Sequence, residues 1–118
     1  MKKQSKELSD TCKVPLQGVK DTSDLLNGKW KTVIIAVLYY NGKLRFMDLG
    51  RYIGKIAPKV LSKELKDLEM NQLVRRTVMD TMPITVEYEL TTQAKSLNKI
   101  LEEMAEWGIK YRKSILKK

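Results

Sequence analysis

Residues 45–90, RFMDLGRYIGKIAPKVLSKELKDLEMNQLVRRTVMDTMPITVEYEL, carry the pattern that decides the fold. A short helix is expected over about 45–52, then a tight turn at Gly54-Lys55-Ile56, then a second helix that begins at Pro58. Proline suits the first helical position because its missing N–H has no intrahelical partner there. A basic hairpin follows at once. Helix, turn, helix and hairpin in this order are typical of a winged helix-turn-helix, which sets one helix in a DNA groove and a wing on the backbone.

The hairpin combines two alternating runs with a pair of arginines. Strands are predicted over 73–78 and 85–90, with the tip at 80–83. Arg75 and Arg76 are neighbours, so their side chains point to opposite faces of the first strand. One of them is therefore expected to reach DNA, and the other to pair with a glutamate of the return strand.

The second helix of this unit presents lysines on the side opposite its leucines. A helix fits the major groove, and lysine donors reach phosphates or guanine edges. The alternative is an ordinary solvated face, but the place between a short helix and a basic hairpin favours DNA. Together with the start of the preceding helix and the hairpin, this face supplies the candidate DNA-binding residues Arg45, Lys59, Ser62, Lys63, Lys66, Arg75 and Arg76.

Helical patterns flank this unit on both sides, so the expected order is α-α-α-α-β-β-α. Residues 1–13 are expected to form a mobile basic arm, and residues 14–118 a single domain. A helix from Val14 ends at Asn27-Gly28, and a second runs from about Lys29 to Tyr40. The apolar spacing of this second helix predicts a core stripe of Trp30, Val33, Ile34, Val37 and Leu38.

The last helix, capped by Thr91 or Thr92, carries an apolar stripe too wide for one small core. Such a helix beyond the winged unit suggests a homodimer, which also matches the paired half-sites of operators. The alternative is that the whole stripe packs within the chain. The candidate dimerisation residues are Leu97, Ile100, Leu101, Met104, Trp107 and Tyr111.

Composition and the absence of certain motifs exclude several classes of function. The 118 residues carry a net charge of +9, which suits a polyanion partner, although residues 54–90 contain equal numbers of acidic and basic side chains. With no histidine and one cysteine, a zinc site of the usual type is excluded, and no cofactor is expected. The sequence contains neither a phosphate-binding loop nor a nucleophile elbow, so we do not expect an enzyme. With neither a membrane span nor a signal peptide apparent, a reducing cytoplasm is expected.

The single cysteine, Cys12, stands beside Lys13 in a basic stretch. A nearby cation favours the thiolate, which is the form that oxidants attack. In a two-fold dimer the two copies could join in a disulfide. The alternative is an unremarkable exposed thiol.

Several short motifs resemble the HxlR-type branch of bacterial winged-helix regulators, which is related in fold to the MarR group. They span about residues 12–108 in family order, and they are Gly28-Lys29-Trp30-Lys31, Arg45-Phe46-x-x-Leu49, Ile56-x-x-Lys59-x-Leu61, Leu65-x-x-Leu68-Glu69, Leu73-Val74-x-Arg76, Pro83-x-x-Val86-Glu87-Tyr88-x-Leu90-Thr91, and Leu97 through Trp107-Gly108. Two positions depart from the family. Lys13 replaces a proline after the cysteine, and Ala57 replaces a serine that caps the recognition helix.

The resemblance implies a homodimeric, non-enzymatic transcription regulator in a bacterial cytoplasm. It implies that the helix after Ile56 reads a roughly palindromic DNA operator and that the first and last helices build the dimer. It also implies that Cys12 matches a cysteine that senses oxidants or electrophiles in some members. Two alternatives remain open. One is a redox switch in which oxidation of Cys12 alters DNA binding, and the other is a protein-binding winged helix, against which the lysine face argues.

Overall fold

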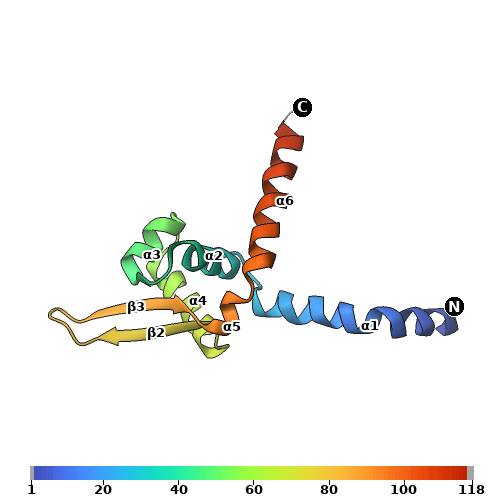
Figure 1. Cartoon of the computed structure of the whole chain (residues 1–118), viewed down its shortest axis with the longest axis horizontal. Helices are drawn as coiled ribbons and strands as arrows, with labels where there is room; N and C mark the ends of the chain where they lie inside the picture. The colour runs from blue at the N-terminus through green and yellow to red at the C-terminus, as the bar shows by residue number, and fades with distance from the viewer. Residues whose placement is uncertain (1, 117–118) are drawn as a thin grey trace.

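The computed structural model describes the backbone of residues 2–116 and the side chains of residues 13–116. Its elements follow one another as α1 (Lys2–Leu25), α2 (Lys31–Asn41), β1 (Leu44–Arg45), α3 (Phe46–Ile53), α4 (Pro58–Met70), β2 (Val74–Met79), β3 (Thr85–Leu90), α5 (Thr92–Lys95) and α6 (Asn98–Leu116). Helices α2, α3 and α4 gather beside the β2–β3 hairpin, whereas α1 and α6 extend away from them (Figure 1). The predicted winged helix-turn-helix is confirmed.

The sheet has three antiparallel strands in the order β1-β3-β2. The hairpin pairs Val74 with Leu90 at its base and Met79 with Thr85 near its tip, within a residue of the predicted strand bounds. The third strand, β1, was not expected. It forms because Gly42, with φ 79°, ends α2, and the chain then passes along β3, pairing Leu44 with Tyr88.

The core lies where α2, α3 and α4 meet the base of the sheet. Its fully buried members are mostly the leucines and isoleucines of these helices, completed by the sheet and by Leu101 at the start of α6. The predicted stripe on α2 was right for Ile34 and Leu38 but wrong for Val33, which is 40% exposed. Ile35 is fully buried instead, because α2 packs against both α3 and α4.

The two ends of the chain differ from their predicted helices. The first helix begins at Lys2 rather than at Val14 and contains Pro15. The final helix is divided. Helix α5 ends at Lys95, the hydroxyl of the next residue, Ser96, donates to the Gln93 carbonyl at 2.5 Å, and α6 starts at Asn98. Thr91 caps α5 as expected, accepting from the Ala94 N–H at 3.1 Å. Whether residues 1–13 act as a mobile arm stays a prediction.

The molecule is elongated. Its Cα radius of gyration is 18.1 Å, and its extents are 66 × 40 × 24 Å. A compact chain of this length has a radius of gyration of about 13–14 Å. The excess comes from α1 and α6, which project from the winged unit as two arms (Figure 1). Among the described side chains of α1, none is buried.

Candidate nucleic-acid interface

Helix α4 is held at a defined angle by the turn before it. Gly54, with φ 85°, ends α3, and the extended residue Ala57 begins α4 without a side-chain cap, as its sequence predicts. Pro58 occupies the first turn. Leu61, Leu65 and Leu68 are at most 1% exposed, so one side of α4 is anchored in the core. The opposite side is thereby turned outward.

That outward side carries the four predicted polar residues, and all four are exposed: Lys59, Ser62, Lys63 and Lys66. The ammonium of Lys63 lies 3.5 Å from the carboxylate of Asp67, one helical turn further on. Among the described residues, Lys59 and Lys66 have no ion-pair partner. Two of the three lysine charges are thus uncompensated, which is what a phosphate-binding surface requires.

The wing arginines separate as the strand alternation predicts. Arg75 lies 3.8 Å from Glu89 across the hairpin, on the face that also carries Glu87. Arg76 is on the other face, opposite Tyr88, and it lines a cleft of about 300 Å³ together with Ser62, Lys66 and Glu69 of α4. The cleft therefore lies between α4 and the wing. The wing's glutamates lie on the face away from this cleft.

Arg45 is placed differently from the other candidates. It is exposed, precedes α3, and lies in β1, which pairs with the opposite edge of β3 from β2. Nearby, the ammonium of Lys43 lies 3.9 Å from both Glu87 and Glu89. The structure therefore does not bring Arg45 into the cleft between α4 and the wing.

A residue that the sequence analysis missed fastens α4 to α2. Lys31 is only 7% exposed, and its ammonium donates to Glu64 at 2.5 Å and to Asp67 at 3.3 Å. The hydrogen bond to the Glu64 carboxylate raises the pKa of Lys31 above its ordinary value, and this outweighs the effect of burial. The hydrogen bond from Lys31 likewise lowers the pKa of Asp67. The sequence carried only a weak sign of this contact, which was the i, i+3 spacing of two carboxylates on α4, Glu64 and Asp67.

The candidate dimerisation residues fall into two groups. Leu101 is 4% exposed and belongs to the core, so it is not available to a second copy, whereas Leu97 packs against the core but is only partly buried, and its role in a dimer stays a prediction. They pack within the chain because the first turn of α6 closes the core beside α2. The others are exposed, from 44% to 67%, and they are Ile100, Met104, Tyr111 and Trp107. The Trp107 and Tyr111 rings stack with centroids 4.9 Å apart, which forms an apolar ledge on α6.

One contact beyond the core fixes how α6 leaves the winged unit. The Tyr39 hydroxyl of α2 donates to the Glu102 carboxylate at 2.8 Å. Because this bond favours the protonated phenol, it raises the pKa of Tyr39 above its ordinary value. The arm is thus hydrogen-bonded to the winged unit one residue beyond Leu101.

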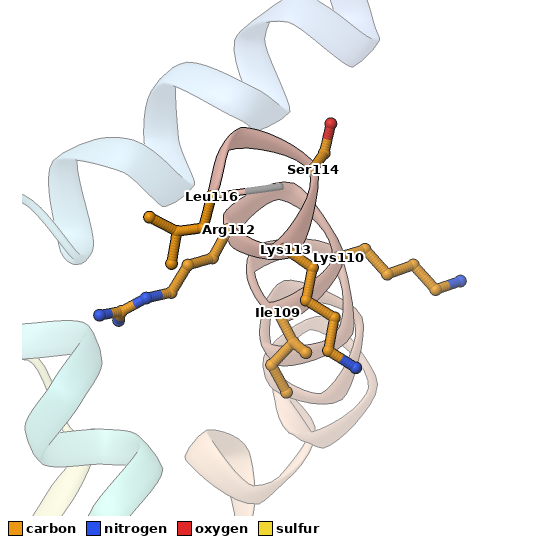
Figure 2. A pocket seen from close by; sticks show the side chains of 6 residues that line it. All are labelled: Ile109, Lys110, Arg112, Lys113, Ser114 and Leu116. Atoms are coloured by element: carbon orange, nitrogen blue, oxygen red, sulfur yellow. The ribbon is translucent and has the colours of Figure 1, made fainter. Parts of the chain in front are cut away.

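Three other features of the described residues bear on ligand and membrane binding. Residues at the end of α6 line a hollow, but Arg112 and Leu116 point to one side of the helix and Lys110 to the other (Figure 2). Within the described part of the chain there is no group of three metal-ligating side chains. No helix among the described residues is long and apolar enough to cross a membrane. The side chain of Cys12 lies outside the described residues.

Known proteins match most of the chain. A family model described as HxlR-like helix-turn-helix covers residues 25–115. An HTH-type transcriptional regulator of Halalkalibacterium halodurans is 48% identical over 89 residues, which are 75% of this chain and 79% of that protein. The reduced form of the redox regulator HypR has a TM-score of 0.78 at 33% identity, covering 86% of this chain and 99% of that one. Its oxidised form has a TM-score of 0.73 at 34% identity, with 79% and 95% covered.

Proposed function

The chain belongs to the HxlR-like helix-turn-helix family and is a DNA-binding transcriptional regulator, and we propose that it acts as a homodimer on a palindromic operator. In each protomer α4 enters the major groove, and the wing contacts the backbone beside it. The action is binding, without catalysis or a cofactor, and takes place in the cytoplasm where the bacterial chromosome lies.

The observation that carries this proposal is the cleft between α4 and the wing. Ser62 and Lys66 from the helix and Arg76 from the strand line the same cleft, although they come from different elements. Lys59 and Lys63 extend the basic surface along α4. Lysine and arginine donors that converge in this way fit the phosphates that border a groove. Residues 54–90 have no net charge, but Glu64, Glu87 and Glu89 form ion pairs away from this cleft. Of the described side chains, Glu69 is the one acidic group that lines it, against the two cations Lys66 and Arg76.

The two projecting arms support the dimer. Val14 and Val19 on α1 are 80% and 62% exposed, and Trp107 on α6 is 67% exposed. A helix with no buried face is marginal in water, because most helical stability in proteins comes from packing an apolar side against a neighbour. A second copy of the chain offers the same arms, so a two-fold contact would bury both.

The test is binding of the wild-type protein to a duplex taken from the region upstream of its own gene. We expect retention in a gel-shift assay, competition by unlabelled upstream DNA but not by a shuffled duplex, and an affinity that falls linearly with salt on logarithmic axes. A protein that binds neither duplex at low salt would instead support a protein-binding winged helix.

A second candidate function is a redox-responsive switch, favoured by the likeness to a redox regulator solved in reduced and oxidised forms. Here the chain has a single cysteine, so any disulfide at Cys12 joins two molecules. We expect diamide-treated protein to run as a covalent dimer on a non-reducing gel and to change its operator affinity, and Cys12→Ser to do neither. If Cys12→Ser loses or gains affinity with diamide as the wild type does, Cys12 is a bystander.

A further inference from the structure

The carboxylates of α4 are not distributed as its sequence suggests. Helix α4 carries three lysines and three acidic residues, and two of those acids lie against α2. There they meet Lys31, whose side chain is 8% exposed, whereas that of Glu64 is 12% and that of Asp67 is 38% exposed. Asp67 thus lies at the boundary between the core and the outward face of the helix.

One oxygen of Asp67 is shared by two ammonium groups. Its Oδ2 lies 3.3 Å from the Nζ of Lys31 and 3.5 Å from the Nζ of Lys63. The Lys31 bond runs into the partly buried side, and the Lys63 side chain is 71% exposed. Asp67 therefore binds Lys31 more firmly than Lys63, since an exposed i, i+4 pair such as Lys63–Asp67 is weak and is screened by salt.

We propose that Lys31 is a positioning residue for DNA binding: from α2 it shares the carboxylates of Glu64 and Asp67, so Asp67 holds its exposed partner Lys63 only weakly and a DNA phosphate can take Lys63 from it. The inference rests on the proposed role of α4 in the groove. Without Lys31, Lys63 is the remaining ion-pair partner of Asp67, so its side chain is held against Asp67 and away from the DNA. A carboxylate without its buried counter-charge would also repel the phosphates of the DNA.

The decisive variant keeps the fold while removing the counter-charge. Lys31→Met alone leaves Glu64 buried and unpaired, so it is expected to lower the Tm. Adding Glu64→Leu replaces the buried ion pair with apolar side chains, a change that is often neutral for stability. The double variant is expected to fold, to bind the upstream duplex about threefold to tenfold more weakly, and to show a salt slope shallower by about 0.9 per recognition helix.

Rescue distinguishes this role from a merely structural one. Adding Asp67→Asn to the double variant releases Lys63 and should restore both affinity and salt slope. In the wild-type background, Asp67→Asn should tighten binding by about twofold to fivefold. The substitution removes the exposed i, i+4 pair that holds Lys63, and it removes a carboxylate that repels the DNA phosphates. Glu106→Gln is the matched control, since it removes the carboxylate of the i, i+4 pair with Lys110 on α6 and should change nothing.

Each outcome has a definite meaning. If the folded double variant binds with the affinity and salt slope of the wild type, the inference is wrong and Lys31 only stabilises the fold. If the double variant does not fold, Lys31→Met measured below its lowered Tm decides, and wild-type affinity and salt slope in that variant overturn the inference. Wild-type protein that fails to bind any duplex overturns the proposed function as well, whereas wild-type binding with unaltered variants overturns the inference alone.

Discussion

Replacing Trp107 with aspartate is expected to separate the protomers while leaving each of them folded. Trp107 is 67% exposed in the single chain and stacks only on its neighbour Tyr111 among the described aromatic rings, so the core loses nothing. A carboxylate placed in an apolar contact between two helices is desolvated without a partner, which opposes association. Sedimentation of the variant should give a monomer. Its far-ultraviolet circular dichroism should keep the helical signal of the winged unit, with any loss confined to the projecting arms.

The consequence for DNA binding is expected to be large. Two linked recognition helices bind with an avidity that exceeds that of one helix by roughly 100-fold to 10,000-fold. Loss of the dimer should therefore lower operator affinity by at least about 100-fold and remove the dependence on two half-sites.

Leu101→Asp provides the contrasting variant. Leu101 lies on the same helix but is 4% exposed and belongs to the core, so aspartate there should unfold the chain instead of dissociating it. Wild-type protein that sediments as a monomer at micromolar concentration would contradict the dimer. A Trp107→Asp protein that remains a dimer would place the interface elsewhere.

The second large effect is expected on the outward face of α4. Lys59→Ala and Lys63→Ala each remove an exposed ammonium from a helix whose other side is anchored by buried leucines, so stability should hardly change. If one of them reads a base edge, its loss should cost about 1–3 kcal/mol, or roughly fivefold to 150-fold, at one operator position. If it contacts phosphate, the loss should be uniform across sequences, with the salt slope reduced by about 0.9.

Fluorescence anisotropy on the upstream duplex and on single-base variants, over a salt series, separates these two results. Lys110→Ala is the matched control, because Lys110 is 75% exposed and pairs with Glu106 as Lys63 pairs with Asp67, but on the distant helix α6. If the Lys59→Ala/Lys63→Ala double variant binds the upstream duplex with wild-type affinity, the assignment of α4 as the DNA-reading helix is wrong.

Much of the winged unit could be predicted from its sequence, because the signals there are local. Proline at 58 and the glycine at 54 act through their own backbone geometry, and strand alternation acts through neighbouring residues. From these signals the bounds of α4 and β3 were predicted as they are observed, and Arg75 and Arg76 were correctly predicted to lie on opposite faces of β2. The DNA contacts of these residues remain predictions, since they depend on a partner.

What only the tertiary structure decided was which surfaces meet. Leu101 and Trp107 belong to the same predicted apolar stripe, yet one closes the core and the other is exposed, because α2 meets the start of α6, where Tyr39 donates to Glu102. Similarly, a lysine at position 31 looks like any solvated charge until α4 brings Glu64 to within 2.5 Å of it. Local sequence sets backbone conformation through nearest neighbours, whereas burial and charge pairing depend on segments more than thirty residues apart, as for Lys31 and Glu64 with a separation of 33. For that reason the sequence by itself determined a winged helix with a lysine-bearing outward face on α4, and the packing alone determined which charges of that helix are held in ion pairs.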